Sequence, residues 1–304
     1  MQSTPTMIDF EAKPDPLALV DTPVAILEVE SDSGVLLIEA GRTEQQYWRD
    51  LWSYRELFYF LTWRDLLVRY KQTLVGVSWS LIRPLLTMGV LTLVFGKLGK
   101  MPSGGVPYPL LVFCGMLPWQ LFSTSVSEGG NSLVLNSTLI SKVYFPRLVI
   151  SVSSILPGFV DFLISGAFIV VLMAWYRFVP PSNVVFLPFF VALALGASLG
   201  TALWISALMV EYRDFRFIVP FIVQFGLYIS PVGFKSSVVP ERFRLLYSLN
   251  PMVGVIDGFR WCLLGGASNI YWMSVAIAVV GVAVLLLSGI WYFRRTEQTF
   301  ADVI

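Results

Sequence analysis

Long apolar runs alternate with short polar segments from about residue 78 onward. A helix that crosses a membrane needs about 20 mostly apolar residues. Six segments approach or reach that length: Ser78–Gly96, Tyr108–Val126, Leu148–Ala174, Val184–Val210, Phe217–Phe234 and Tyr271–Phe293. Trp and Tyr lie near several segment ends, at the level where aromatic rings meet lipid headgroups. The pattern predicts an all-α membrane protein with six transmembrane helices.

The pattern before the first apolar run is polar. Residues 1–46 contain several acidic residues and prolines, and no basic segment followed by an apolar run suggests a cleavable signal peptide. Within this N-terminal arm, Val24–Glu30 and Val35–Ala40 flank a Gly-containing turn at Ser31–Gly34. Two β-prone runs around such a turn predict a small β-hairpin.

Residues 47–71 lack Gly and Pro and are rich in helix-forming residues, so we expect a helix there. Aromatic residues such as Trp52 and Trp63 are mixed with cations such as Arg64 and Arg69. That mixture is typical of an amphipathic helix lying along a membrane surface. An ordinary cytoplasmic helix stays open as the alternative, because the charges do not share one face.

The stretch 235–266, before the last span, contains apolar patches that are too short to cross a membrane. Apolar segments of about 10–14 residues often enter and leave the bilayer on one side. The stretch therefore predicts two short re-entrant helices, with an ordinary external loop as the alternative. Irregular backbone at membrane depth is tolerated where it is buried in protein or lines a wet cavity. The candidate gate residues are Pro240, Asn250, Pro251 and Arg260.

The composition supports the membrane assignment. Of the 304 residues, 56% are hydrophobic and 13% are charged, whereas soluble domains carry about 25% charged residues. A net charge of +1 gives no general case for nucleic-acid binding. Basic residues lie in both proposed inner loops and near both ends, so the positive-inside rule favours cytoplasmic termini.

The residue types present argue against catalysis. The chain has no histidine, which excludes histidine triads and histidine metal sites. Cys114 and Cys262 lie in apolar runs, where buried free thiols are expected. Gly196–Gly200 matches the GxSxG nucleophile pattern, but its apolar helical setting indicates a helix-packing face instead. The GxxxxGK pattern of ATP-binding loops is absent, so we expect ATP chemistry on a partner chain.

Two ionisable residues fall inside predicted spans, where a charge is expensive and usually functional. Arg83 lies about one turn into the first span, so its side chain can reach the cytoplasmic headgroups. Asp161 lies deeper, in the third span. A packing role and a role in a transport pathway both stay open for Asp161.

Several phrases of the sequence, in this order, resemble the permease subunits of ABC exporters of cell-surface polysaccharides. The matching phrases are Arg64–Trp79, Val94–Gly96, Glu211–Phe215, Leu249–Met252, Gly258–Arg260, Tyr292–Glu297 and Phe300–Ile304. The likeness runs from about Tyr47 to the end. It divides the chain into a cytoplasmic arm (1–46), an interface helix (47–71) and a six-helix transmembrane export domain (72–304). Residues 1–46 exceed the short tail expected in that family, and their role stays open.

The resemblance implies a multi-pass protein of the bacterial inner membrane that exports a lipid-linked polysaccharide of the O-antigen, capsule or teichoic acid type. It implies a homodimer around a channel, with two ATP-binding cassette subunits that carry ATP and Mg, so this chain itself needs no cofactor or metal. The identity of the glycan and its lipid carrier stays open. The alternatives are the permease of a small-molecule or drug ABC exporter, and a membrane enzyme acting on lipid-linked sugars.

The resemblance also assigns candidate sites. An aromatic channel wall can stack on sugar faces without requiring one hydrogen-bond pattern. Cations near the inner headgroups can bind the pyrophosphate of a lipid carrier, although plain membrane anchoring of these cations is the slightly favoured interpretation. The ATPase-coupling residues are Glu211, Tyr212, Arg213, Asp214, Phe215 and Arg216, and the first inner loop lies at about Asn131–Arg147. The headgroup candidates are Arg64, Arg69 and Lys71, and the channel candidates are Trp79, Phe95, Phe221, Phe225 and Tyr228.

Overall fold

The computed structural model describes residues 49, 51–71, 78–143, 145–265, 270–297 and 300, all within the compact unit Thr43–Ile304. Every regular element in these ranges is a helix, which confirms the all-helical prediction. The arm 1–46, with its predicted hairpin, lies outside the described residues.

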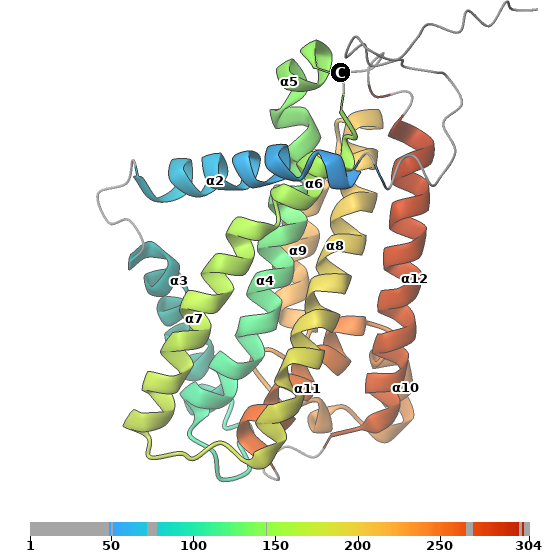
Figure 1. Ribbon diagram of the computed structural model, residues 1–304. Coiled ribbons are helices and arrows are strands. Elements are labelled where there is room, and N and C mark those ends of the chain that lie inside the picture. Colours follow the sequence, from blue (N-terminus) through green and yellow to red (C-terminus); the bar gives the residue numbers. More distant parts are fainter. Residues whose placement is uncertain are drawn as a thin grey trace, which may run out of the picture. The chain divides into compact units, whose positions relative to one another are not determined.

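Five helices in the described part of the chain are long and apolar enough to cross a membrane, and they run side by side in Figure 1. Two of them, α4 (Tyr108–Leu135) and α12 (Trp272–Glu297), are continuous. The other three are composite: α3 (Trp79–Leu91) with the π-helix η2 (Thr92–Leu98), α6 (Leu148–Ser153) with α7 (Leu156–Trp175), and the 3-10 helix η3 (Ser182–Phe186) with α8 (Leu187–Glu211).

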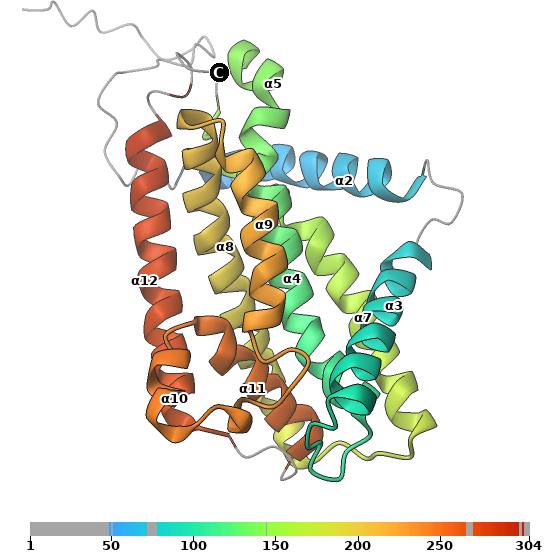
Figure 2. The same cartoon turned by 180° about the vertical axis from the view of Figure 1, so that it is seen from behind.

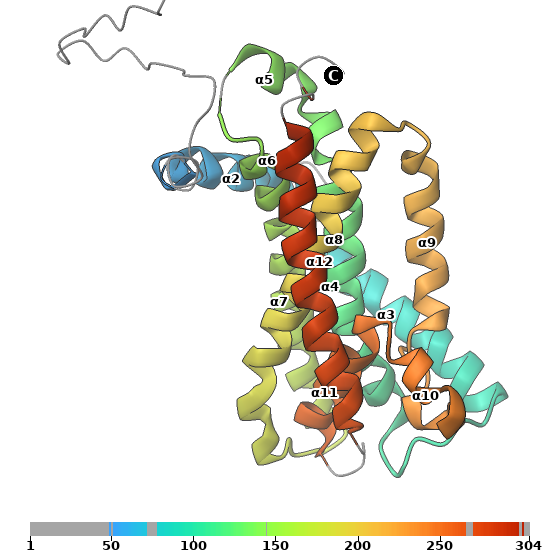
Figure 3. The same cartoon turned by 90° about the vertical axis from the view of Figure 1, so that its right-hand side faces the viewer.

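The remaining predicted span, Phe217–Phe234, is represented by a shorter apolar helix, α9 (Phe215–Ile229). Helix α9 ends because Ser230 has an extended backbone conformation and Pro231 follows it. A short turn joins α9 to α8, and Figure 3 shows α9 at one edge of the bundle. Five spans and one shorter helix therefore occupy the predicted positions.

Short helices lie at both ends of the bundle. The segment 47–71, predicted as an interface helix, contains the helix α2 (Arg55–Lys71), which lies across one end of the bundle (Figure 1). The short helix α5 (Ser137–Lys142) lies at the same end. At the opposite end, the stretch 235–266 forms η4 (Ser236–Val238), α10 (Glu241–Tyr247) and α11 (Pro251–Leu264), and Figure 2 shows the last two.

Helix α4 forms the centre of the bundle and packs against α7, α8, α9 and α11. Its run Leu110–Trp119 is buried throughout, which explains why so many consecutive apolar residues show no amphipathic pattern. Helices α8 and α12 approach each other closely at two glycines. A Cβ on Gly200 would lie 2.7 Å from the backbone of Leu285, and a Cβ on Gly289 would lie 2.6 Å from the Gly200 carbonyl. This is the small-residue packing face that the Gly196–Gly200 pattern predicts.

The α8–α12 contact leads to a prediction about stability. Gly200→Val is expected to lower the free energy of unfolding by about 3 kcal/mol, because the backbone of α12 must move to admit the side chain. Thermal unfolding of the detergent-purified protein measures the effect. Gly166→Val on α7 is the matched control, since a Cβ there meets nothing within 4 Å. Equal losses of stability in both variants would contradict the prediction.

A charged cavity beneath the interface helix

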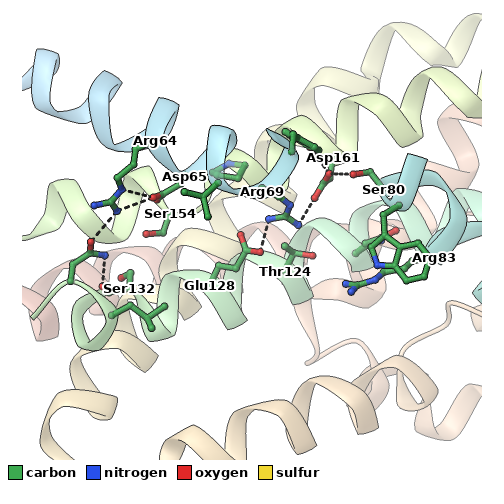
Figure 4. Close-up of a pocket in the computed structure, with 17 residues that line it drawn as sticks. Arg64, Asp65, Arg69, Ser80, Arg83, Thr124, Glu128, Ser132, Ser154 and Asp161 are labelled. Carbon is green, nitrogen blue, oxygen red and sulfur yellow. Dashed lines mark hydrogen bonds and ion pairs between the residues drawn. The ribbon is translucent and has the colours of Figure 1, made fainter. Parts of the chain in front are cut away.

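A cavity of about 910 Å³ lies beneath α2, between α3, α4 and α7, and Figure 4 shows its lining. Most of the residues that line it are polar or charged, although three of the four helices are apolar over most of their length. The charged residues in the wall are Arg64, Asp65, Arg69, Arg83, Glu128 and Asp161. The cavity therefore gathers both signs of charge at the end of the bundle where α2 lies.

Arg69 connects three helices across this cavity. Its Nη1 lies 2.5 Å from Glu128 Oε1 of α4, and its Nη2 forms an ion pair with Asp161 Oδ2 of α7 (Figure 4). Two carboxylates thus hold one guanidinium, and the planar Arg side chain suits such a pair of contacts. Arg69 fixes the end of α2 to the bundle.

The carboxylate of Asp161 is bound by three side chains from two helices, α2 and α3. Besides its ion pair with Arg69, its Oδ1 accepts hydrogen bonds from Tyr70 (2.7 Å) and Ser80 (2.5 Å). Burial raises the pKa of Tyr70 to about 12, and the hydrogen bond to Asp161 acts in the same direction. Tyr70 therefore remains a donor at neutral pH. Asp161 has the hydrogen-bonded packing role that one of the two open readings described.

The other two arginines of the cavity, Arg64 and Arg83, differ in the number of hydrogen bonds that they form. Arg64 donates to Asp65 Oδ1 (2.9 and 2.8 Å) and to Asn136 Oδ1 (2.9 Å). The guanidinium of Arg83 lies 5.5 Å from the Trp79 ring and has no ion pair or hydrogen bond with any described residue. Arg83 is exposed, so it is the cavity cation with the most freedom to meet a ligand.

The structure brings together two of the three predicted headgroup residues. Arg64 and Arg69 line the cavity, whereas Lys71 is exposed at the end of α2 and does not line it. Sequence reasoning missed Glu128 and Asn136, because the second span was expected to end at Val126, while α4 continues to Leu135. The sequence did single out Arg83 and Asp161, because both are ionisable residues within apolar runs.

Arg260, a predicted gate residue, is 0% exposed at the opposite end of the bundle. Its three nitrogens donate to backbone carbonyls: Nε to Leu111 (3.2 Å), Nη1 to Phe234 (2.7 Å) and Nη2 to Val232 (2.7 Å). These bonds join α11, α4 and the segment after α9. Arg260 is therefore a buried connector at the base of the predicted gate.

The other gate candidates lie at helix starts. Pro240 is the N-cap of α10, and Pro251 is the first residue of α11. The side chain of Asn250 caps α11 by accepting from the Met252 amide (3.0 Å) and donates to Ser230 Oγ (3.0 Å). Asn250 thus connects α11 to the end of α9.

The predicted coupling residues form the exposed turn between α8 and α9. Tyr212, Arg213, Asp214 and Arg216 are exposed, and Phe215 is half-buried. The rings of Tyr212 and Phe215 lie 6.4 Å apart, and Glu211 accepts a hydrogen bond from Tyr292 of α12 (3.1 Å). The turn therefore presents aromatic and charged side chains together.

The predicted channel residues lie on three elements, α3, η2 and α9. Phe221 and Phe225 are stacked at 5.8 Å on α9 and exposed, as is Tyr228 on the same helix. Trp79 lines the charged cavity, and Phe95 lies 6.0 Å from the Phe234 ring. Phe95 also fills the space above Gly233, where a Cβ would lie 2.6 Å from its ring.

The two cysteines and the serine of the GxSxG pattern are all buried inside the bundle. Cys114 and Cys262 are free and buried, as expected. Ser198 of the GxSxG pattern lies inside α8 and donates to the carbonyl of Ala194 (2.7 Å). It is thus a helix-packing residue and not an exposed nucleophile.

Comparisons with known proteins point in one direction. The model of the family described as ABC-2 type transporter matches residues 56–264. The chain is 29% identical over 259 residues to O-antigen export system permease protein RfbA of Myxococcus xanthus, across 84% of this chain and 98% of that protein. A protein of the same name from Klebsiella pneumoniae is 27% identical over 250 residues, across 82% and 95%. Polysialic acid transport protein KpsM of Escherichia coli is 20% identical over 239 residues, across 77% and 91%.

Proposed function

This chain belongs to the ABC-2 type transporter family, and from that premise we propose that it is the membrane subunit of an ATP-driven exporter of a lipid-linked polysaccharide. It is a transport subunit and not an enzyme. Relatives named for O-antigen export and polysialic acid transport support a polysaccharide cargo. The ATP and Mg chemistry belongs to a separate partner chain.

The cavity beneath α2 is the observation that carries this proposal. Three arginines, Arg64, Arg69 and Arg83, face a space of about 910 Å³ at the end of the bundle where the surface helix lies. Arginine is well suited to phosphate because its fixed fork of donors matches the phosphate oxygens. The cavity accepts the pyrophosphate of a lipid carrier, and Arg83 makes the first contact because its guanidinium lies beside the Trp79 ring and has no ion pair or hydrogen bond with any described residue.

A binding measurement tests the cargo. The purified protein is titrated with a lipid-pyrophosphate-linked oligosaccharide and, separately, with a small amphipathic drug of similar hydrophobicity. The proposal expects saturable binding of the glycolipid that Arg83→Gln weakens about tenfold. Binding of the drug alone, unaffected by Arg83→Gln, would instead favour the small-molecule exporter.

The proposed topology has six crossings in the bacterial inner membrane, with both termini in the cytoplasm. The 15 residues of α9 span roughly 22 Å, so the segment after Ile229 is needed to complete the sixth crossing. Helices α10 and α11 are re-entrant and form the outer gate. Their position opposite α2, and the extensive burial of α11, support this assignment.

A second copy of the chain completes the channel. Helix α9 exposes Phe217, Phe221, Phe225 and Tyr228, and Val219 is its one buried residue. Helix α3 is also mostly unburied. In the proposed homodimer these faces turn toward the partner copy, so aromatic rings line the glycan path.

The cytoplasmic end docks an ATP-binding cassette subunit through the Glu211–Arg216 turn and through α5. Both lie at the end of the bundle where α2 lies (Figures 1 and 3). Tyr212 is 52% exposed, which leaves its ring available to a pocket on the partner.

The docking proposal makes a prediction. Tyr212→Ala combined with Arg213→Glu is expected to reduce co-purification of the ATPase subunit at least tenfold, because an aromatic anchor is lost and a charge is reversed. The matched control, Phe243→Ala with Arg242→Glu on α10, likewise removes one aromatic ring and reverses one arginine charge, but at the outer end. Undiminished complex formation and ATPase stimulation by the Tyr212 variant would refute docking at this turn.

A further inference from the structure

The end of α12 is bound to the start of α6. The backbone amide of Arg147, at the N-terminus of α6, donates to Glu297 Oε1 (2.7 Å). The Nη1 of Arg147 donates to the backbone carbonyl of Glu297. Arg147 and Glu297 thus meet through both backbone and side chain, although they are 150 positions apart in the sequence.

Phe300 completes this contact. Its ring lies 5.8 Å from the Arg147 guanidinium and 5.5 Å, edge to face, from the Phe293 ring. Phe300 is 0% exposed. It belongs to an apolar cluster that also contains Ile140 of α5 and Phe145. The described tail residue is therefore a core residue of the cytoplasmic end.

Helix α5 has few other attachments. Ile140 is its one buried residue, and the flanking Leu135 and Val143 are 78% and 51% exposed. Along its length, α12 packs mainly against α8 and α11. The contact of Glu297 and Phe300 with Arg147 is thus what links α12 to the loop that carries α5.

We propose that Arg147, Glu297 and Phe300 form a clamp that sets the position of α5 relative to α12. This inference rests on the proposed function, in which α5 contacts the ATP-binding subunit. A clamped α5 transmits the motion of that subunit to the spans, whereas a released α5 moves with the subunit without displacing them. The three residues are positioning residues, because they act through α5 and touch neither ATP nor glycan.

A distance measurement tests the clamp without any partner. Spin labels at Ser141→Cys on α5 and Arg295→Cys on α12 occupy exposed positions, and both native cysteines are buried. The clamp predicts one narrow distance distribution, which broadens at least twofold in Glu297→Leu and in Phe300→Ala. Glu297→Gln keeps an acceptor for the Arg147 amide and is expected to keep the narrow distribution. An unchanged distribution in folded Glu297→Leu and Phe300→Ala would overturn the clamp.

A second measurement tests its consequence in the complex of the full-length chain with the ATPase subunit. Glu297→Leu is expected to lower glycolipid transported per ATP hydrolysed at least fivefold while the subunit still co-purifies. Glu297→Gln restores the ratio, and Glu56→Leu, at an exposed position near the start of α2, serves as the matched control. If Phe300→Ala does not fold, Phe300→Leu takes its place. If the wild-type protein binds no ATPase subunit, the proposed function is refuted. If the wild type and the Glu297→Leu variant transport the same amount of glycolipid per ATP hydrolysed, the clamp alone is refuted.

Discussion

Arg260→Ala is expected to lower the free energy of unfolding by about 4 kcal/mol. The carbonyls of Val232 and Phe234 lose their donors at once, and each buried acceptor left unsatisfied costs about 1–3 kcal/mol. The Leu111 carbonyl also loses the Arg260 bond but keeps its helical partner within α4. A total near 4 kcal/mol is a large part of the 5–15 kcal/mol that stabilises a typical domain. Thermal unfolding of the purified protein measures the loss.

Two other substitutions make the Arg260 prediction specific. Gly115→Ala is expected to act in the same direction, since a Cβ there would lie 2.6 Å from Arg260 Nη2. Arg242→Ala, on the exposed face of α10, is expected to change stability by less than about 0.5 kcal/mol. An Arg260→Ala protein as stable as Arg242→Ala would show that the Val232 and Phe234 carbonyls find other partners.

Arg69→Gln is expected to reduce both stability and glycolipid binding. Glu128 and Asp161 then face each other without a cation, which costs about 2 kcal/mol. The cost is below the roughly 3–5 kcal/mol of a fully buried pair, because Arg69 and Glu128 keep partial solvent contact. Thermal unfolding and glycolipid titration on the same preparation measure the two effects.

A compensated variant separates the two roles of Arg69. Arg69→Gln with Glu128→Gln and Asp161→Asn removes all three charges, so stability is expected to recover largely. Glycolipid binding is expected to stay about tenfold weaker, because the phosphate still lacks its cation. Lys97→Gln, at the outer end of the first span, is the matched control for loss of one positive charge. If the triple variant binds the glycolipid as well as the wild type does, Arg69 has only a structural role and does not contact the phosphate.

The apolar runs were sufficient to predict the positions of the five long helices, because a span of about 20 apolar residues has few other stable states. They were not sufficient to place the helix ends. The second span was expected to end at Val126, yet α4 continues to Leu135 through Glu128. Glu128 is accommodated because Arg69, 59 positions away, neutralises it. A hydropathy pattern contains no information about such a distant partner.

The hydropathy pattern also predicted some residues of the charged sites, but not their arrangement. Arg64, Arg69, Arg83 and Asp161 stood out because each is a charge in or beside an apolar run. Their arrangement into one cavity depends on α2 crossing above α3, α4 and α7, which only the fold supplies. Arg260 was expected at the gate, but its burial against three carbonyls follows from the path of the chain after α9. Glu297 and Phe300 fall within two phrases that carry the family resemblance, but nothing in the sequence pairs them with Arg147, 150 positions away from Glu297.

The central claim is that this chain, with an ATP-binding partner, moves a lipid-linked polysaccharide across a membrane. Its most direct test is reconstitution of the chain and its ATPase subunit in vesicles that contain a lipid-pyrophosphate-linked glycan, with a membrane-impermeant lectin reporting the exposed glycan. The account predicts that ATP moves glycan away from the leaflet that faces the ATPase subunit, and that Arg83→Gln slows this movement about tenfold. ATP hydrolysis by an intact complex with no change in lectin-accessible glycan would contradict it.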